Sequence, residues 1–154
     1  MFWIAFAAVI WLFIFLFLRS DLIKYWSAGF WSVLAGYFLN DFFIKNGFYF
    51  FNNTLYPIRG TPAAFFILLA GIGIVIIFFL PQDKIWQLPY LIFLSAIFSG
   101  LELFTEKQGF LTYLQWTPYY SFLFKLFFLI ALAWLSSLTI KPRKNSYYFD
   151  RNAF

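Results

Sequence analysis

The sequence predicts an all-α integral membrane bundle, and three observations lead to that prediction. Hydrophobic residues make up 64% of the 154 residues and charged residues only 11%, against about 25% in ordinary soluble domains. The mean hydropathy is +0.80. Five apolar runs, each long enough to cross a bilayer, follow one another along the chain. A soluble domain of this length has too little interior to bury so much apolar surface, so we expect one transmembrane domain over residues 1–154.

The apolar runs are expected to be helices because backbone groups in lipid must bond within their own segment. The runs also lack the alternation of a barrel strand. At about 1.5 Å rise per residue, each run spans roughly 25–35 Å, close to the thickness of the hydrocarbon core. The predicted helices cover residues 2–18, 26–44, 63–80, 88–104 and 118–140, followed by a short basic cytoplasmic tail over residues 141–154.

The ends of the runs are marked by charges or proline. Arg19 follows the first run, Lys45 follows the second, and Pro81 stops the third. The fourth gives way to a polar stretch over residues 105–108, and the fifth is followed by Lys141. The first run lacks a positive n-region before it and an A-x-A site after it, so we expect a retained helix rather than a cleaved signal peptide.

Basic residues are distributed unevenly over the connecting segments, which sets the expected orientation. Cytoplasmic segments of membrane proteins carry an excess of Lys and Arg, and this rule favours an N-terminus outside and a C-terminus in the cytoplasm. The inner side then has seven basic residues and the outer side three; they are Arg19, Lys24, Lys84, Lys141, Arg143, Lys144 and Arg151 inside, and Lys45, Arg59 and Lys107 outside. The same rule explains the net charge of +5 without a nucleic-acid partner.

The composition excludes several kinds of chemistry. The chain has no Cys and no His, which removes thiolate metal sites, His-ligated haem and His-based acid–base catalysis. No HExxH, GxSxG or Walker motif is present. Two isolated acids on different helices, Asp41 and Glu102, are a weak signal for a catalytic carboxylate pair. We therefore expect no metal, no cofactor and no enzymatic activity.

Three ionisable residues, Asp41, Glu102 and Lys125, fall inside the apolar runs. A charge at the bilayer centre costs roughly 2.5–3.5 kcal/mol on insertion scales. Helical side chains lean toward the N-terminus of their helix, so both acids lean back into the membrane and Lys125 leans outward. All three approach a similar depth near the outer boundary, where an ion pair or a triad lowers their cost. The sequence leaves open which acid pairs with the lysine.

Spacing along the helices predicts which faces turn inward. One polar stripe recurs at steps of four, three and four, and we expect it to face the bundle interior; it comprises Ser95, Ser99, Glu102 and Glu106. Small residues that permit close helix packing recur on the second and third runs; they are Gly29, Gly36, Ala70, Gly71 and Gly73. The first run has no polar residue in its interior, so a peripheral helix is expected.

Two longer connections, about residues 45–62 and 105–117, lie on the predicted outer side. The second is expected to run along the membrane interface, with its apolar side chains dipping into lipid; those side chains are Phe110, Leu111, Tyr113, Leu114 and Trp116.

Two segments carry a resemblance to a known family. The segments are LELFTEKQGFLTYLQWTPYYSFLF, residues 101–124, and NDFFIKNGFYFFNNTLYPIR, residues 40–59. The first resembles the C-terminal part of an uncharacterised family of small five-helix polytopic membrane proteins of endospore-forming bacteria. The second is similar to that family's Asp-containing second helix and its Tyr-Pro-x-Arg loop. The corresponding positions are Asp41, Tyr56, Pro57, Arg59, Glu102, Glu106, Lys107, Trp116, Tyr119, Tyr120 and Ser121. The resemblance implies a multi-pass protein of the bacterial plasma membrane or spore membrane, and it implies no activity.

These observations define a predicted outer-side polar cluster. Its members are Asp41, Glu102, Lys125, Asn40, Arg59, Ser99, Glu106, Trp116 and Tyr120. One hypothesis is a site that binds a small polar ligand or supports transport. The alternative is a clamp that only fixes helix packing, in a structural or accessory subunit of a larger membrane complex. Five short helices leave little room for alternating access, an objection that a homo-oligomer would ease.

Overall fold

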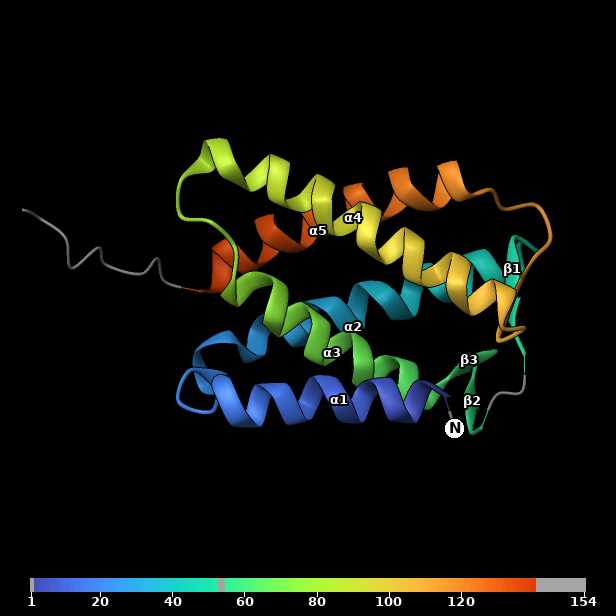
Figure 1. Cartoon of the computed structure of the whole chain (residues 1–154), viewed down its shortest axis with the longest axis horizontal. Coiled ribbons are helices and arrows are strands. Elements are labelled where there is room, and N and C mark those ends of the chain that lie inside the picture. Colours follow the sequence, from blue (N-terminus) through green and yellow to red (C-terminus); the bar gives the residue numbers. More distant parts are fainter. Residues whose placement is uncertain (1, 53–54, 141–154) are drawn as a thin grey trace, which may run out of the picture.

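The structure, a computed structural model, describes residues 2–52 and 55–140. This part of the chain is mostly helical. Its five helices are α1 (Phe2–Phe17), α2 (Leu22–Lys45), α3 (Ala63–Phe78), α4 (Lys84–Lys107) and α5 (Pro118–Thr139). Successive helices run in alternating directions (Figure 1), and the main packing pairs are α2 with α3, α1 with α3, and α4 with α5. The predicted basic tail over residues 141–154 lies outside the described residues.

Two short antiparallel ribbons lie at one end of the bundle, which we call the β end (Figure 1). In the first, β1 (Tyr49–Phe51) pairs with β4 (Leu111–Tyr113), so that Tyr49 lies opposite Tyr113. In the second, β2 (Pro57–Ile58) pairs with β3 (Thr61–Pro62). The β end therefore gathers both long connections, together with the C-terminal ends of α2 and α4 and the N-terminal ends of α1, α3 and α5.

The pairing of β1 with β4 shows that part of the connection over residues 105–117, predicted to dip into lipid, faces the protein instead. Leu111 is only 4% exposed, and Trp116 packs against Phe43 with ring centroids 4.8 Å apart. The hydrogen bonds to β1 hold this connection against the bundle with Leu111 and Trp116 turned inward, whereas Leu114 is 60% exposed. Apolar composition alone does not distinguish a segment that contacts lipid from one that covers a protein interior.

The predicted helix bounds agree with the observed ones to within two residues for α1, α3 and α5. In contrast, α2 begins four residues before the predicted start of 26, and α4 extends beyond 88–104 by four residues at its start and three at its end. Hydropathy marks only the apolar part of a helix, whereas the hydrogen-bonded backbone continues into the polar residues on either side.

Small residues bring α2 and α3 together, as their spacing predicts. A Cβ atom added at Gly73 would lie 2.6 Å from the Cβ of Ser32 and 2.8 Å from the carbonyl oxygen of Ala28. At Gly29 it would lie 3.0 Å from the carbonyl oxygen of Ala70. α1 packs mainly on α3, and α5 packs on α4 and α2. The bundle therefore has α1 at its periphery.

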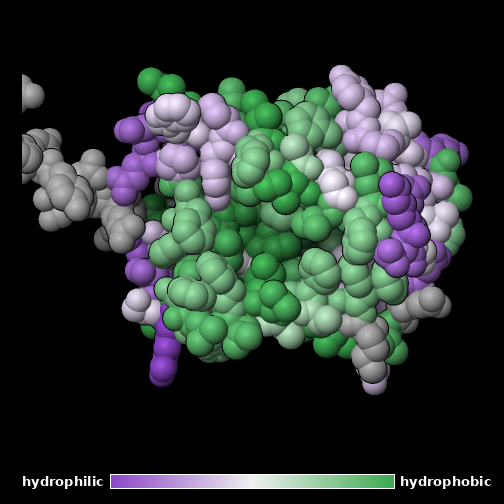
Figure 2. All heavy atoms as spheres, in the orientation of Figure 1, coloured by the Kyte–Doolittle hydropathy of each residue, from purple (hydrophilic) through white to green (hydrophobic). Residues whose placement is uncertain are grey.

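The sides of the bundle expose large hydrophobic side chains on every helix, for example Val9, Phe38, Ile67, Phe93 and Phe127. Figure 2 shows a broad hydrophobic surface between two ends that carry the hydrophilic residues. α4 and α5 are long and apolar enough to cross a membrane, and only 22% and 17% of their apolar windows are buried within the protein. These two helices suggest a membrane location.

Candidate functional site

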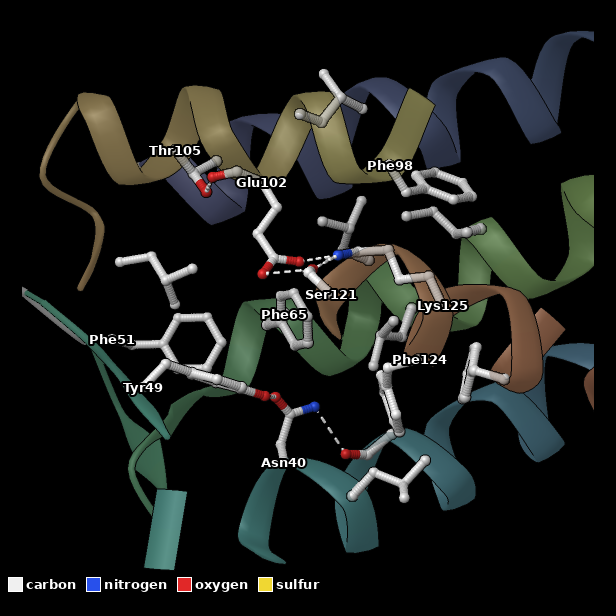
Figure 3. A pocket seen from close by; sticks show the side chains of 18 of the residues that line it. Asn40, Tyr49, Phe51, Phe65, Phe98, Glu102, Thr105, Ser121, Phe124 and Lys125 are labelled. Atoms are coloured by element: carbon white, nitrogen blue, oxygen red, sulfur yellow. Dashed lines mark hydrogen bonds and ion pairs between the residues drawn. The ribbon is translucent and has the colours of Figure 1, made fainter. Parts of the chain in front are cut away.

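A cavity of about 220 Å³ lies in the half of the bundle nearer the β end. All five helices and the strands β1 and β4 contribute to its wall, which is mostly aliphatic and aromatic (Figure 3). The polar side chains on this wall are few; apart from the two indoles, they are Asn40, Tyr49, Glu102, Thr105, Ser121 and Lys125. Polar contacts on the described wall of the cavity must therefore come from these residues and from the two indoles.

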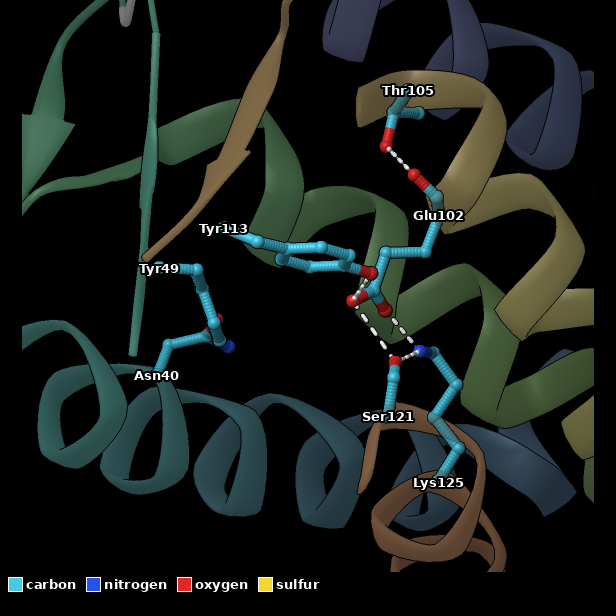
Figure 4. A network of polar contacts seen from close by, with 7 residues as sticks. All are labelled: Asn40, Tyr49, Glu102, Thr105, Tyr113, Ser121 and Lys125. Atoms are coloured by element: carbon cyan, nitrogen blue, oxygen red, sulfur yellow. Dashed lines mark hydrogen bonds and ion pairs between the residues drawn. The ribbon is translucent and has the colours of Figure 1, made fainter. Parts of the chain in front are cut away.

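The ion pair between Glu102 and Lys125 is the central feature of this wall. The Lys125 Nζ pairs with Glu102 Oε2 and also donates to Ser121 Oγ. Ser121 Oγ donates to Glu102 Oε1 at 2.9 Å, and the Tyr113 hydroxyl donates to the same oxygen at 2.5 Å (Figure 4). The side chains of Lys125 and Glu102 are only 19% and 20% exposed. Both charges are thus compensated inside the protein.

Local structure explains how these groups meet. Ser121 and Lys125 are four residues apart on α5, which places them on the same face. Pro118 begins that helix, and the Thr117 hydroxyl at its N-cap accepts a hydrogen bond from the Tyr120 amide at 3.4 Å. Gly109, with φ of +73°, allows the chain to turn sharply after α4. That turn brings the chain back toward α4, so that Tyr113 on β4 reaches the carboxylate of Glu102.

Asn40 on α2 forms a second polar group on the cavity wall. Its Nδ2 donates to the carbonyl oxygen of Gly36 at 2.8 Å, and its Oδ1 accepts from the Tyr49 hydroxyl at 2.5 Å. Asn40 is 8% exposed. The predicted members Asn40, Glu102 and Lys125 are therefore brought to one cavity, from three different helices (Figure 3).

The two tyrosines of the β1–β4 ribbon remain protonated at neutral pH. Burial raises the pKa of Tyr49, and the negative charge of Glu102 raises it further. Burial is also the main cause of the raised pKa of Tyr113, followed by the charge of Glu102 and their hydrogen bond. Both hydroxyls therefore act as hydrogen-bond donors, one to Asn40 and one to Glu102.

Asp41 lies apart from this cavity, so no triad forms. It accepts hydrogen bonds from Lys45 Nζ at 2.8 Å and from Arg59 Nη1 at 3.0 Å. The guanidinium of Arg59 also lies 5.3 Å from the ring centroid of Tyr37. Neighbouring residues of a helix point about 100° apart, so Asn40 faces the cavity while Asp41 faces the surface. The predicted cluster is thus divided into an interior part and a surface part.

The remaining predicted residues are distributed over both parts. Trp116 lines the cavity, whereas Tyr120 is 55% exposed and does not line it. Ser99 is buried, and its Oγ has no hydrogen-bond partner among the described residues. Glu106 is partly buried on the next turn of α4 and is likewise not among the lining residues. The polar stripe on α4 therefore faces inward, but only Glu102 reaches the cavity.

Tyr49, Tyr113 and Ser121 are site residues that the predicted cluster omits. Helical spacing was a sufficient signal for Ser121, because it precedes Lys125 by four residues. The tyrosines had no such signal, since their positions depend on the pairing of two strands about sixty residues apart.

The fold and the site thus define a helical bundle with two helices able to cross a membrane and an apolar cavity that holds one ion pair. No protein-family model, curated protein or solved structure matches the chain.

Proposed function

We propose that the protein is an integral membrane protein with five membrane-spanning helices, and that its cavity binds a small molecule through the Glu102–Lys125 pair. In this proposal the β end faces the outside, as the basic residues predict, and the protein belongs to a bacterial plasma or spore membrane. In this proposal the Glu102–Lys125 pair binds a ligand and does not catalyse a reaction.

The distribution of polar and apolar surface supports five spans. Every helix exposes large hydrophobic side chains along its length, and successive helices alternate in direction. α1 and α3 have 16 residues each, which corresponds to about 24 Å. Apolar residues continue beyond both helices, through Leu18 and through Phe79 and Leu80. A modest local thinning of the bilayer accommodates the remaining difference.

The observation that carries the binding proposal is that the ion pair lines a cavity. Burying two charges is expensive, and a pair that only joins helices is best enclosed by packed side chains. Here space of about 220 Å³ adjoins the pair, which exceeds the roughly 150 Å³ of an engineered cavity that binds benzene. Ionisable groups that face a cavity within a membrane commonly mark a ligand or ion pathway.

A second candidate function is the packing clamp of an accessory subunit. The observation in its favour is that Glu102 accepts hydrogen bonds from Tyr113, Ser121 and Lys125, so its carboxylate is satisfied without a ligand. Such a network also ties α4, β4 and α5 together.

Native mass spectrometry of the protein in mild detergent separates the two functions. The informative variant is the double substitution Glu102→Gln with Lys125→Met, which removes both charges together. Gly100→Ala is the matched control, because a Cβ at this exposed position of α4 meets no atom within 4 Å. We expect the wild-type protein and the control to carry one small molecule per chain, and the double variant to lose it.

A stoichiometric protein partner with an empty cavity would instead support the accessory role. The binding proposal would be overturned if the wild-type protein carries no bound molecule and is no more stable than the double variant.

A further inference from the structure

The cavity is covered at the β end of the bundle. Tyr49 and Phe51 on β1 and Leu111 on β4 line it from that end, and Leu111 is almost fully buried. Phe48 packs edge-on against Trp116 with ring centroids 5.4 Å apart. Since the tyrosine hydroxyls of the ribbon are turned to partners inside, the described residues at this end provide no polar route to water.

The side of the bundle is open instead. α4 packs against α5 and β4, while α3 packs against α1 and α2. Toward the other end, the Tyr90 hydroxyl donates to the carbonyl oxygen of Ile76 at 3.1 Å and links α4 to α3. Nearer the β end, the space between these helices is part of the cavity, lined by Phe65 and Leu69 on α3 and by Phe98 and Leu101 on α4.

The surface agrees with this arrangement. Figure 2 shows a hollow lined by hydrophobic side chains near the centre of the face, between α4 and α3. Leu101 lines the cavity and is nevertheless 41% exposed, so it lies at the rim of this opening. In a five-span protein this opening faces the acyl chains of the bilayer rather than water.

Building on the proposed function, we propose that the ligand is a single-chain lipid with a neutral, oxygen-bearing head group, which enters sideways from the bilayer. Its chain lies between α3 and α4, and its head accepts a hydrogen bond from Lys125. A cavity of about 220 Å³ holds the head and the first part of one chain, and the remainder of the chain extends through the opening into lipid.

The hydrogen bonds that Glu102 and Lys125 already form indicate which head group fits the cavity. Glu102 Oε1 accepts from Tyr113 and Ser121, and Glu102 Oε2 accepts from Lys125. Of the three donor hydrogens on an ammonium group, Lys125 uses one for Glu102 and one for Ser121, which leaves one. The ion pair therefore offers one donor hydrogen on Lys125 and one remaining acceptor site on Glu102 Oε2, a combination that a neutral head with a hydroxyl group matches.

Charge and a second donor favour a neutral head. The ion pair has no net charge, so an anionic head would be desolvated without a compensating cation. Trp3 also lines the cavity, and its Nε1 is buried without a hydrogen-bond partner among the described residues. Hydroxyl and ester oxygens, as in a monoacylglycerol, satisfy such donors without introducing a charge.

Photolabelling in proteoliposomes tests the proposal. The probe is a monoacylglycerol that carries a diazirine on its acyl chain, and labelled peptides are mapped by mass spectrometry after illumination. We expect labelling of the cavity-lining parts of α3 and α4. Excess unlabelled monoacylglycerol should reduce it at least fivefold, and this competition requires no substitution.

Two tryptophan substitutions test the opening. Leu101→Trp adds bulk at the rim without altering the ion pair, and labelling in the cavity should fall at least fivefold. Phe93→Trp is the matched control, because Phe93 is an exposed residue of the same helix that does not line the cavity; labelling should be unchanged.

Other outcomes would overturn the proposal. Labelling confined to the outer faces of the helices, without competition by the unlabelled lipid, would exclude lateral entry. Stronger competition by a fatty acid of equal chain length would exclude the neutral head group. If a water-soluble molecule co-purifies with the wild type and is lost from the double variant, the proposed function survives while lateral entry fails. If no molecule depends on Glu102 and Lys125, both fail.

Discussion

Glu102 on α4 and Lys125 on α5 form an ion pair on the wall of a mostly apolar cavity. The pair joins two helices that cross the hydrophobic part of the bundle, and it has two polar neighbours that donate to the same carboxylate. The ion pair and its neighbours lead to predictions about stability. The packing of α2 on α3 and the exposed ends of the bundle lead to two further predictions.

Removing one partner of the ion pair should destabilise the protein strongly. Lys125→Met leaves Glu102 as an uncompensated, largely shielded charge, which costs about 3–5 kcal/mol in comparable buried pairs. The double variant with Glu102→Gln removes both charges and should recover most of that loss. Thermal unfolding in detergent measures the loss of stability in Lys125→Met and its recovery in the double variant. Equal melting temperatures for the wild type and Lys125→Met would show that the pair is neither a clamp nor a site.

Tyr113→Phe should destabilise the protein by about 1.5–3 kcal/mol, the range for a hydrogen bond to a charged group. The expected loss arises because Glu102 loses one of its donors while keeping its charge. Tyr119→Phe is the control, since Tyr119 is 67% exposed near the start of α5. A Tyr113→Phe variant as stable as this control would contradict the assigned hydrogen bond.

The contribution of Tyr113 should also depend on pH. Its pKa is raised in the folded protein, mainly by burial and then by the charge of Glu102. The folded state therefore holds the phenolic proton more tightly than the unfolded state, whose pKa is about 10. The resulting stability is complete below pH 10 and decreases as the pH rises above it. The difference in melting temperature between the wild type and Tyr113→Phe should shrink above pH 10, and a constant difference would contradict this assignment.

Gly73→Ala should disrupt the contact between α2 and α3. The added methyl group would lie 2.6 Å from the Cβ of Ser32, and overpacking of this kind costs about 1–3 kcal/mol. Gly100→Ala should have the opposite effect, because a methyl group at this position meets no other atom within 4 Å. The free energy of unfolding should rise by roughly 0.5–1 kcal/mol, since alanine has less backbone freedom than glycine in the unfolded chain. If the two variants shift the melting temperature in the same direction, the proposed helix contact is wrong.

The chain has no Cys, so single cysteines report orientation without background labelling. Gln108→Cys lies at the β end and Gln82→Cys at the opposite end, and both positions are exposed. A membrane-impermeant maleimide applied to intact cells should label the first and not the second. The reverse pattern would place the β end in the cytoplasm and would contradict the proposed orientation.

Much of the helical framework could be predicted from the sequence because it depends on local properties. Long apolar runs indicate helices, and the small residues Gly29 and Gly36 on α2 and Gly73 on α3 indicate where backbones approach. The expectation that Lys125 pairs with an acid also came from local reasoning, since depth and side-chain direction follow from position along a helix. The helix ends were less accurate, because polar residues such as Lys84 and Lys107 continue the backbone hydrogen bonding beyond the apolar run.

Only the tertiary structure decided which acid meets the lysine and what surrounds the pair. Asp41 and Glu102 have similar depth and direction in the sequence, yet the rotation of α2 turns Asn40 inward and Asp41 toward Arg59. The donors Tyr49 and Tyr113 depend on a strand pairing between distant connections, and the cavity depends on how five helices fail to fill the space between α3 and α4. The sequence by itself therefore determined an apolar, helical chain with ionisable residues inside its apolar runs, since hydrophobicity and periodicity are local. The assembly of the site is a property of contacts between distant segments, which no local pattern contains.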